Sequence, residues 1–206
     1  MTAPTGSTVY LASRSPRRRE LLTQIGVRYD LLLFRGGARD DPETGEDVLP
    51  DEAAADYVRR VAMAKVRHGC QLVALRRLLP HLVLSADTTL EVDGRIVGKP
   101  ADEIDAEAIL RSLSGRAHNV LTAVALADGE RAEVVLSTSE VRFRPLTADE
   151  IHRYARSGEP LDKAGAYGIQ GQAAMFVEEI RGSHSGIVGL PLCETALLLR
   201  RFGHPI

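Results

Sequence analysis

Strand-like and helix-like segments alternate along this chain of 206 residues, and two hairpin patterns interrupt the alternation. The apolar run Val9–Ala12 predicts a strand, and Pro16–Ile25, which ends before Gly26, predicts a helix with an apolar stripe. The dipeptides Asp93–Gly94 and Asp128–Gly129 each separate two strand patterns, as hairpin turns do. Helices placed between strands, together with hairpins, predict an α/β fold whose sheet is mixed and partly antiparallel.

The longest helical pattern and the most apolar strand pattern follow one another. Asp51–Leu79 predicts a helical region that ends before Pro80, and Leu82–Ala86 predicts a buried strand that delivers Asp87. The remaining expected elements are strands at 29–33, 89–92, 95–97, 119–126, 133–143 and 174–180, helices at 102–113, 147–156 and 191–201, and loops at 35–49 and 157–171.

Charge and cysteine content exclude several classes of protein. The net charge is −2, which argues against nucleic acid as the main ligand and against attraction to a membrane surface. Cys70 and Cys193 have no metal-site or disulfide spacing, and residues 1–7 contain no apolar stretch typical of a secretory signal. We therefore expect a cytoplasmic protein with a single domain over residues 1–206, of which residues 1–8 form a flexible leader.

The start of the first helix combines several features that favour a phosphate. Ser13 precedes Ser15, which stands at the expected N-cap position, and Pro16 follows at the first helical position. Free N–H groups, the helix dipole and nearby guanidinium groups all attract an anion. Successive helix residues point about 100° apart, so we expect Arg17 and Arg18 to face the ligand and the next arginine to face solvent. The alternative is a capped surface helix with a solvated basic patch, which an arginine run alone would favour.

Three isolated charged residues have both a chemical and a structural interpretation. Asp87 stands at the expected carboxyl end of a buried strand, where it would activate water or hold a cation, but a turn aspartate is equally plausible. Lys99, between Gly98 and Pro100, suits a phosphate contact, although a solubilising turn lysine is the commoner case. Lys65 lies on a partly apolar helix face, where extension of its side chain to the surface is the simplest interpretation.

The loop Glu159–Gly171 concentrates polar side chains among glycines, which let a backbone approach a ligand closely. Asp162 and Lys163 are suited to metal and phosphate, Gln170 can present its amide to a base, and Tyr167 can present a stacking face. A long structural loop is the alternative, and the density of polar groups makes it less favoured.

Taken together, these segments resemble the Maf (septum-formation) family of nucleotide pyrophosphatases. The matching stretches lie in the family's order between Val9 and Gly203, and they are LASRSPRRRELL, SADTTLEVDGRIVGKP, LSGRAHNVLTAVAL, EVRFRPLTADEI, SGEPLDKAGAYGIQG and GLPLCETALLLRRFG. The resemblance implies an elongated, two-lobed α/β domain with a central cleft, similar to Maf and ITPase folds. It also implies hydrolysis of a nucleoside triphosphate between the α and β phosphates, with Mg²⁺ or Mn²⁺ as cofactor and a homodimer as the assembly often found in the family.

The resemblance also assigns roles to individual residues. Asp87 falls on the proposed catalytic aspartate of the family, which acts either as base or as metal ligand. The resemblance also gives Lys99 a catalytic role. The phosphate-binding positions are Ser13, Ser15, Arg17, Arg18, Lys65 and Lys163, and the metal-ligand positions are Asp41, Asp87 and Asp162.

Two details of the resemblance concern the substrate and the metal. Ala-Asp-Thr and Gly-Ile-Gln resemble the branch that acts on dTTP and UTP, so Arg17, Thr88 and Gln170 are the expected specificity residues. Family members carry an Asp-Glu pair after the second strand, whereas here Asp40–Asp41 is the nearest acidic pair in a longer stretch. The alternatives are a pyrophosphatase of the 7-methyl-GTP type and a non-catalytic nucleotide-binding regulator of cell division.

Overall fold

The computed structural model describes residues 8–34 and 45–206, so Asp41 and all of the expected leader except Thr8 lie outside the described residues. The core of the fold is a seven-stranded sheet with the order β2-β1-β3-β5-β6-β7, and β4 pairs with β3. β1 lies parallel to β2 and β3, whereas the other pairs are antiparallel, which confirms the predicted mixed α/β sheet. The strands are β1 (Val9–Leu11), β2 (Tyr29–Leu31), β3 (Val83–Val92), β4 (Arg95–Val97), β5 (Ala117–Ala127), β6 (Ala132–Phe143) and β7 (Val177–Arg181).

Strand β3 is longer than the sequence pattern predicted. Instead of ending before Asp87 and resuming at Thr89, it continues for ten residues and places Asp87 in its middle. The reason is its pairing with β5, which runs without a break from Val83 to Glu91. The prediction of Asp87 at a strand's carboxyl end is therefore wrong.

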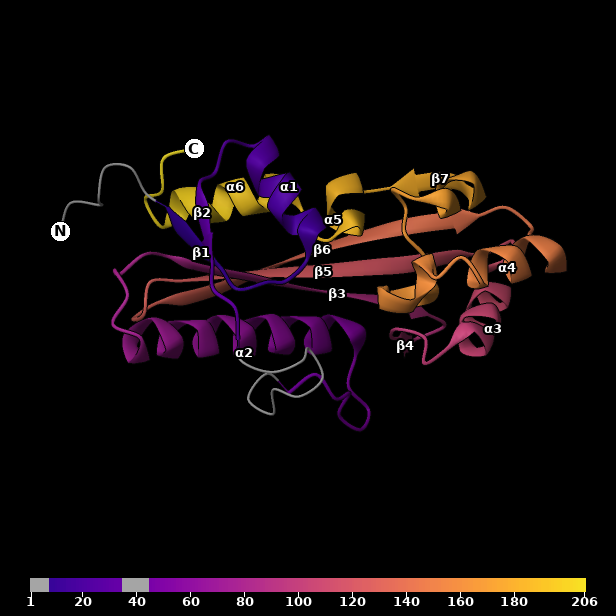
Figure 1. Ribbon diagram of the computed structural model, residues 1–206, viewed down its shortest axis with the longest axis horizontal. Coiled ribbons are helices and arrows are strands. Elements are labelled where there is room, and N and C mark those ends of the chain that lie inside the picture. Colours follow the sequence, from indigo (N-terminus) through magenta and orange to yellow (C-terminus); the bar gives the residue numbers. More distant parts are fainter. Residues whose placement is uncertain (1–7, 35–44) are drawn as a thin grey trace.

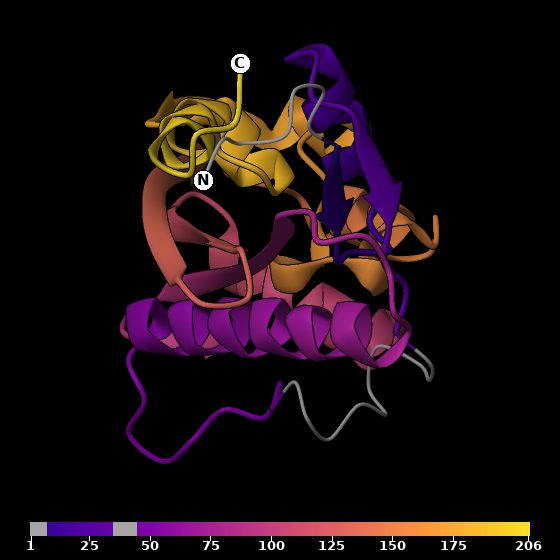
Figure 2. The ribbon, with the colours of Figure 1, turned by 90° about the vertical axis from the view of Figure 1, so that its left-hand side faces the viewer.

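Helices cover both faces of the sheet. Helix α2 (Ala54–Leu75) lies along one face, and α1 (Pro16–Gln24) and α6 (Leu192–Arg201) lie on the other, as Figures 1 and 2 show. Helix α2 continues through Gly69 without a break. This glycine lets the helix lie close to β3, because a Cβ at that position would be 2.7 Å from Val83 Cγ1. Within the described ranges, no helix is long and apolar enough to span a membrane.

A second group of helices gathers at the far end of the long strands and makes the molecule elongated (Figure 1). Helices α3 (Glu103–Leu113) and α4 (Ala148–Ala155) pack there with three short 3-10 helices at 159–162, 164–166 and 172–176. The last of these occupies the expected start of a strand, so β7 begins only at Val177. The short helix α5 (His184–Val188) was not predicted. Each end of the sheet has its own buried apolar cluster, as a two-lobed domain requires.

Candidate active site

Part of one edge of β3 has no neighbouring strand among the described residues. The edge of β3 that faces away from β5 pairs with β1 at Val83 and Leu84 and with β4 from Leu90 to Val92. Residues 85–89 of β3 lie between these two pairings and have no strand partner on that side among the described residues. β1 runs parallel to β3 and β4 runs antiparallel to it, so the carboxyl ends of both short strands point toward this open edge. The chain therefore enters the region beside Asp87 twice, once at Ser13 and once at Lys99.

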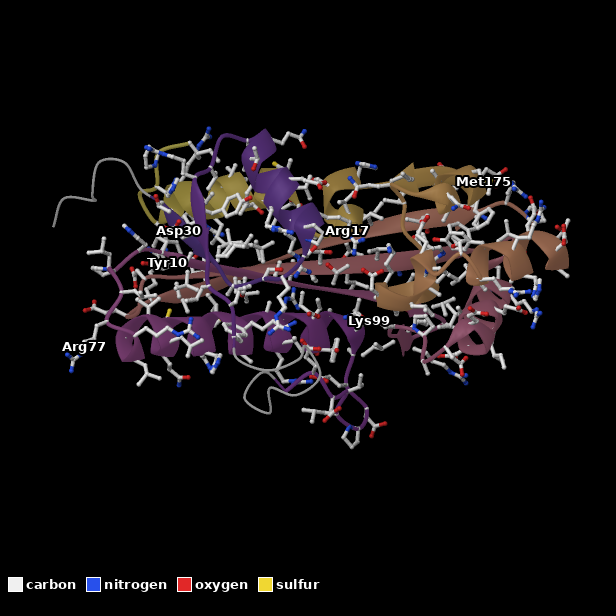
Figure 3. All side chains as sticks on the ribbon, viewed as in Figure 1. Tyr10, Arg17, Asp30, Arg77, Lys99 and Met175 are labelled. Atoms are coloured by element: carbon white, nitrogen blue, oxygen red, sulfur yellow. The ribbon has the colours of Figure 1, made fainter. Side chains whose placement is uncertain are left out.

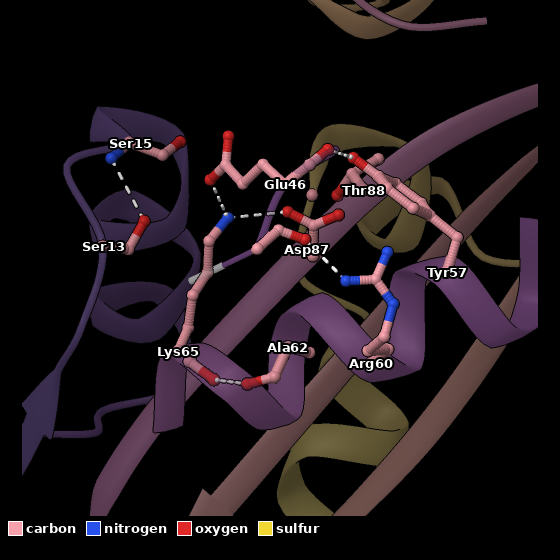
Figure 4. Close-up of polar contacts among 12 residues, drawn as sticks. Ser13, Ser15, Glu46, Tyr57, Arg60, Ala62, Lys65, Asp87 and Thr88 are labelled. Carbon is pink, nitrogen blue, oxygen red and sulfur yellow. Dashed lines mark hydrogen bonds and ion pairs between the residues drawn. The ribbon is translucent and has the colours of Figure 1, made fainter. Parts of the chain in front are cut away.

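The side chain of Asp87 lies on the face of the sheet that α2 covers, and two further charged groups meet it there. Lys65 Nζ lies 2.8 Å from Asp87 Oδ1 and 2.7 Å from Glu46 Oε1 (Figure 4). The Lys65 side chain is only 15% exposed, so its predicted extension to the surface is wrong. The structure instead places one ammonium group between two carboxylates, and Glu46 is a site residue that the sequence reasoning missed.

Arg18 connects the first helix to the opposite face of the same region. Its Nε donates to Gly189 O at 2.9 Å, Nη1 donates to Ser13 Oγ at 3.2 Å and Nη2 donates to Thr88 Oγ1 at 3.2 Å. Burial lowers the pKa of the Arg18 guanidinium, and the negative charge of Asp87 partly opposes this effect. These contacts show Arg18 as an anchor between α1, β3 and the end of α5.

Thr88 points away from Asp87, because successive side chains of a strand alternate between its faces. Its Oγ1 accepts from Arg18 and lies 2.9 Å from Thr122 Oγ1, which in turn donates to Gly186 O at 2.8 Å. This partly buried chain of hydrogen bonds favours a structural role for Thr88 over the expected contact with a base. Arg19 lines a shallow surface hollow with Glu20, away from these contacts.

The start of α1 provides hydroxyl and amide groups close to Arg17. Ser15 is the N-cap residue as predicted, but its side chain accepts no capping hydrogen bond, and its backbone N–H donates to Ser13 Oγ at 3.2 Å. Arg17 Nη2 lies 4.0 Å from Asp162 Oδ2, and Lys163 Nζ lies 2.6 Å from Asp162 Oδ1. Burial raises the pKa of Asp162, but the hydrogen bond from Lys163 and the charges of Lys163 and Arg17 outweigh burial and lower it overall.

The loop after β4 is joined directly to the Gly-rich loop. Gly165 N donates to Gly98 O at 2.9 Å, which brings the segment that follows Lys163 beside Lys99. Lys99 is exposed and has no hydrogen-bond or ion-pair partner among the described residues. Figure 3 shows Lys99 and Arg17 in the middle part of the molecule, below and above the long strands in that view.

The two remaining loop residues differ in their environment. Tyr167 is buried: its ring packs edge-on against Phe143, and its hydroxyl lies 2.8 Å from His118 Nε2. The expectation that it presents a stacking face to a base is therefore wrong. Gln170 is exposed, which leaves its amide accessible from solvent.

The chain is similar to known proteins over almost its whole length. Residues 8–202 match the family described as "Maf-like protein". The "dTTP/UTP pyrophosphatase" of Aromatoleum aromaticum is 60% identical over 98% of this chain and 99% of that protein. The protein of the same name from Dechloromonas aromatica is 57% identical over 95% of this chain and 97% of its own length. The solved structure of the Staphylococcus aureus Ham1 protein covers 66% of this chain and 72% of its own, with a TM-score of 0.42 and 15% identity.

Proposed function

The chain belongs to the Maf family, and from this premise we propose that it hydrolyses dTTP and UTP to the nucleoside monophosphate and pyrophosphate. The observation that carries the proposal is the charge arrangement at the open edge of β3. There the Lys65 ammonium group bridges two carboxylates, next to the phosphate-favouring start of α1. The relatives named for dTTP and UTP favour this activity over the 7-methyl-GTP alternative and over a regulator without turnover.

We propose that the triphosphate binds between the start of α1 and the two loops that meet at Gly98. The uncapped first turn of α1 offers backbone N–H groups, which attract phosphate oxygens together with the helix dipole. Arg17 and Lys163 supply positive charge from the two sides of Asp162, and Lys99 supplies an exposed cation with no protein partner among the described residues. Gln170 stays the proposed contact for the base.

The carboxylate set of the described residues fits Mg²⁺ or Mn²⁺ in the presence of a triphosphate. No group of three or more potential metal ligands lies together in the described part of the chain. Mg²⁺ commonly takes one or two protein carboxylates and completes its coordination with phosphate oxygens and water. We propose that Asp87 and Glu46 hold the cation, which when bound would neutralise charge on the phosphates. Asp162 is the other predicted ligand that the structure describes, and its carboxylate is bonded to Lys163 as that of Asp87 is bonded to Lys65.

The reaction requires water to attack the α phosphorus as the bond to the bridging oxygen breaks and pyrophosphate leaves. The residues of this chain contribute by placing the phosphates and by stabilising the charge that accumulates on the leaving group. Lys65 and Lys99 are suited to that second task because each carries a positive charge at the open edge. The Asp87 carboxylate lies beside the same edge, where it can orient the water or accept its proton.

Release of pyrophosphate from a panel of nucleotides tests the proposed function. With Mg²⁺ or Mn²⁺ present, we expect turnover of dTTP and UTP and much less of CTP, dATP and 7-methyl-GTP. Asp87→Asn should lower kcat by about 10²- to 10⁴-fold, whereas Asp30→Asn, an exposed aspartate on β2, should leave it unchanged. Tight nucleotide binding without release of pyrophosphate would instead support the regulator.

The metal dependence of two variants separates the roles of the carboxylates. If Asp87 and Glu46 hold the cation, excess Mn²⁺ should restore part of the activity of Asp87→Asn and of Glu46→Gln. If Asp87 acts as the base, excess Mn²⁺ should restore only Glu46→Gln.

We also propose a cytoplasmic location and a small nucleotide, not a nucleic acid, as the ligand. Two free cysteines and a net charge of −2 support these proposals. Homodimer formation stays a prediction from the family resemblance.

A further inference from the structure

The backbone on both sides of Glu46 is bound by two side chains from the start of α2. Arg60 Nη1 donates to Gly45 O at 2.6 Å, and Arg60 Nη2 donates to Asp47 O at 2.9 Å. Tyr57 donates its hydroxyl hydrogen to Glu46 O at 2.9 Å. Three consecutive carbonyl groups are therefore held by one pair of residues, and the middle one belongs to the residue whose carboxylate contacts Lys65.

The geometry of an α-helix explains why these two residues can act together. Tyr57 and Arg60 are three positions apart, so their side chains leave the same face of α2, and the Arg60 guanidinium lies 5.5 Å from the centre of the Tyr57 ring. Glu52 fixes the guanidinium from the other side, with Nε 2.6 Å from Oε1 and Nη2 2.8 Å from Oε2. The same Glu52 carboxylate accepts from Leu49 N at 3.1 Å.

Lys65 lies five residues after Arg60 on the same helix. The helix thus carries both the group that contacts the Glu46 carboxylate and the groups that hold the Glu46 backbone (Figure 4). Burial raises the pKa of the Tyr57 hydroxyl, and the charges of Asp87 and Glu46 raise it further, so the hydroxyl stays a neutral donor at physiological pH.

The held segment adds little to the hydrophobic core. Val48 and Leu49 are 50% and 51% exposed, and residues 45, 47 and 50 are exposed as well. Contacts that served only stability would be expected to bury these apolar side chains. The hydrogen bonds instead fix the position of Glu46, the half-buried residue of the segment.

We propose that Arg60 and Tyr57 are positioning residues that hold Glu46 against Lys65 and Asp87. The inference rests on the proposed pyrophosphatase function, because it assigns to Glu46 a part in that reaction. A positioning residue of this kind acts only through the residue it holds. Its effect on turnover should therefore disappear once the Glu46 carboxylate has been removed.

A double-mutant cycle on the full chain tests this inference. Arg60→Met should lower kcat for dTTP by about 10- to 100-fold, the range usual for partners that orient a site group. In a Glu46→Gln background the same change should lower kcat by less than about threefold. Tyr57→Phe removes a single hydrogen bond and should show the same dependence on Glu46 with a smaller effect. Arg60→Lys keeps the charge but not the fork of donors, so it should restore activity only in part.

Arg59→Met is the matched control, because Arg59 is the neighbouring exposed arginine of α2, and its one ion pair within residues 8–34 and 45–206 is with Asp56, at 3.8 Å. It should leave kcat unchanged. A second readout needs no activity: hydrogen exchange at the Leu49 amide should become faster in Arg60→Met, while exchange in the body of α2 stays the same.

The outcomes separate the inference from the proposed function. A wild-type protein that releases no pyrophosphate from dTTP overturns both. If the wild type is active, two results overturn the positioning role alone. One is an Arg60→Met variant as active as the wild type, and the other is a decrease in kcat by the same factor in both backgrounds. If Arg60→Met does not fold, the cycle with Tyr57→Phe decides the question.

Discussion

Lowering the pH from 7 to 5 should destabilise the lobe that carries the Gly-rich loop, because a buried histidine there resists protonation. His118 is 3% exposed and lies 2.8 Å from the Tyr167 hydroxyl, and its ring packs edge-on against Phe143 and Tyr167. Burial lowers the pKa of His118 to about 4. In the described part of the chain its Nδ1 has no hydrogen-bond partner, so protonation would leave a charged donor unsatisfied in the apolar cluster.

The size of the effect follows from the difference between the two states. In the unfolded chain the imidazole has its ordinary pKa of about 6.5, so between pH 6.5 and 4 the unfolded state binds a proton that the folded state does not. Stability contributed by the neutral ring is therefore complete above about pH 6.5 and falls as the pH drops toward 4. The full loss is about 3 kcal/mol, of which about 2 kcal/mol falls between pH 7 and pH 5.

Chemical unfolding of the wild type and of His118→Gln at both pH values measures this contribution. Because other groups also titrate, the relevant quantity is the difference between the two proteins in their loss of unfolding free energy from pH 7 to pH 5. It should be about 2 kcal/mol, or about 4–8 °C in Tm for a chain of this size. His184→Gln, which changes an exposed histidine, should behave as the wild type does. Equal losses in the wild type and His118→Gln would refute the reasoning.

Three further variants probe contacts that the structure shows. Thr88→Val removes the hydroxyl that accepts from Arg18 and should cost about 1–3 kcal/mol of unfolding free energy while the ratio of dTTP to UTP turnover stays constant; a changed ratio would restore Thr88 as a specificity residue. Gly171→Ala would place a Cβ against the Glu159 carboxylate. It should lower the free energy of unfolding by about 1–3 kcal/mol, measured by denaturation, and raise KM for dTTP, measured by kinetics. An unchanged KM would show that this loop does not contact the substrate. Thr147→Ala removes the N-cap of α4 and should cost about 1 kcal/mol in thermal unfolding without changing kcat, and a large loss of activity would contradict this.

Features that depend on neighbouring residues in the chain could be predicted from the sequence. The capping box of Thr147 and Glu150 is present as expected, with the Thr147 side chain accepting from Glu150 N. The turn at Asp93–Gly94 joins β3 to β4, and both of its residues have the positive φ angles that such hairpins need. These signals operate within a few residues, so the rest of the fold does not change them.

Features that depend on tertiary packing were harder to predict. Glycines in the 159–171 loop suggested close approach of a ligand, yet Gly165 is needed because a Cβ would overlap Leu90 in the core. Tyr167 is drawn into the same cluster beside His118, which no local pattern indicates. Glu46 was missed because its position depends on Tyr57 and Arg60, more than ten residues away.

The open edge of β3, in contrast, has a cause that is visible in the sequence. If β1 continued in its register with β3, the chain would reach Pro16 opposite Thr89. If β4 continued in its own register, Pro100 would stand opposite Asp87. Proline has no N–H to donate to a strand ladder and fixes φ, so neither strand can extend through this region. Pro100 thereby stops β4 from pairing at Asp87, whereas Pro16 stops β1 only at Thr89, and each proline follows directly on a residue proposed to bind phosphate, Lys99 in the first case and Ser15 in the second.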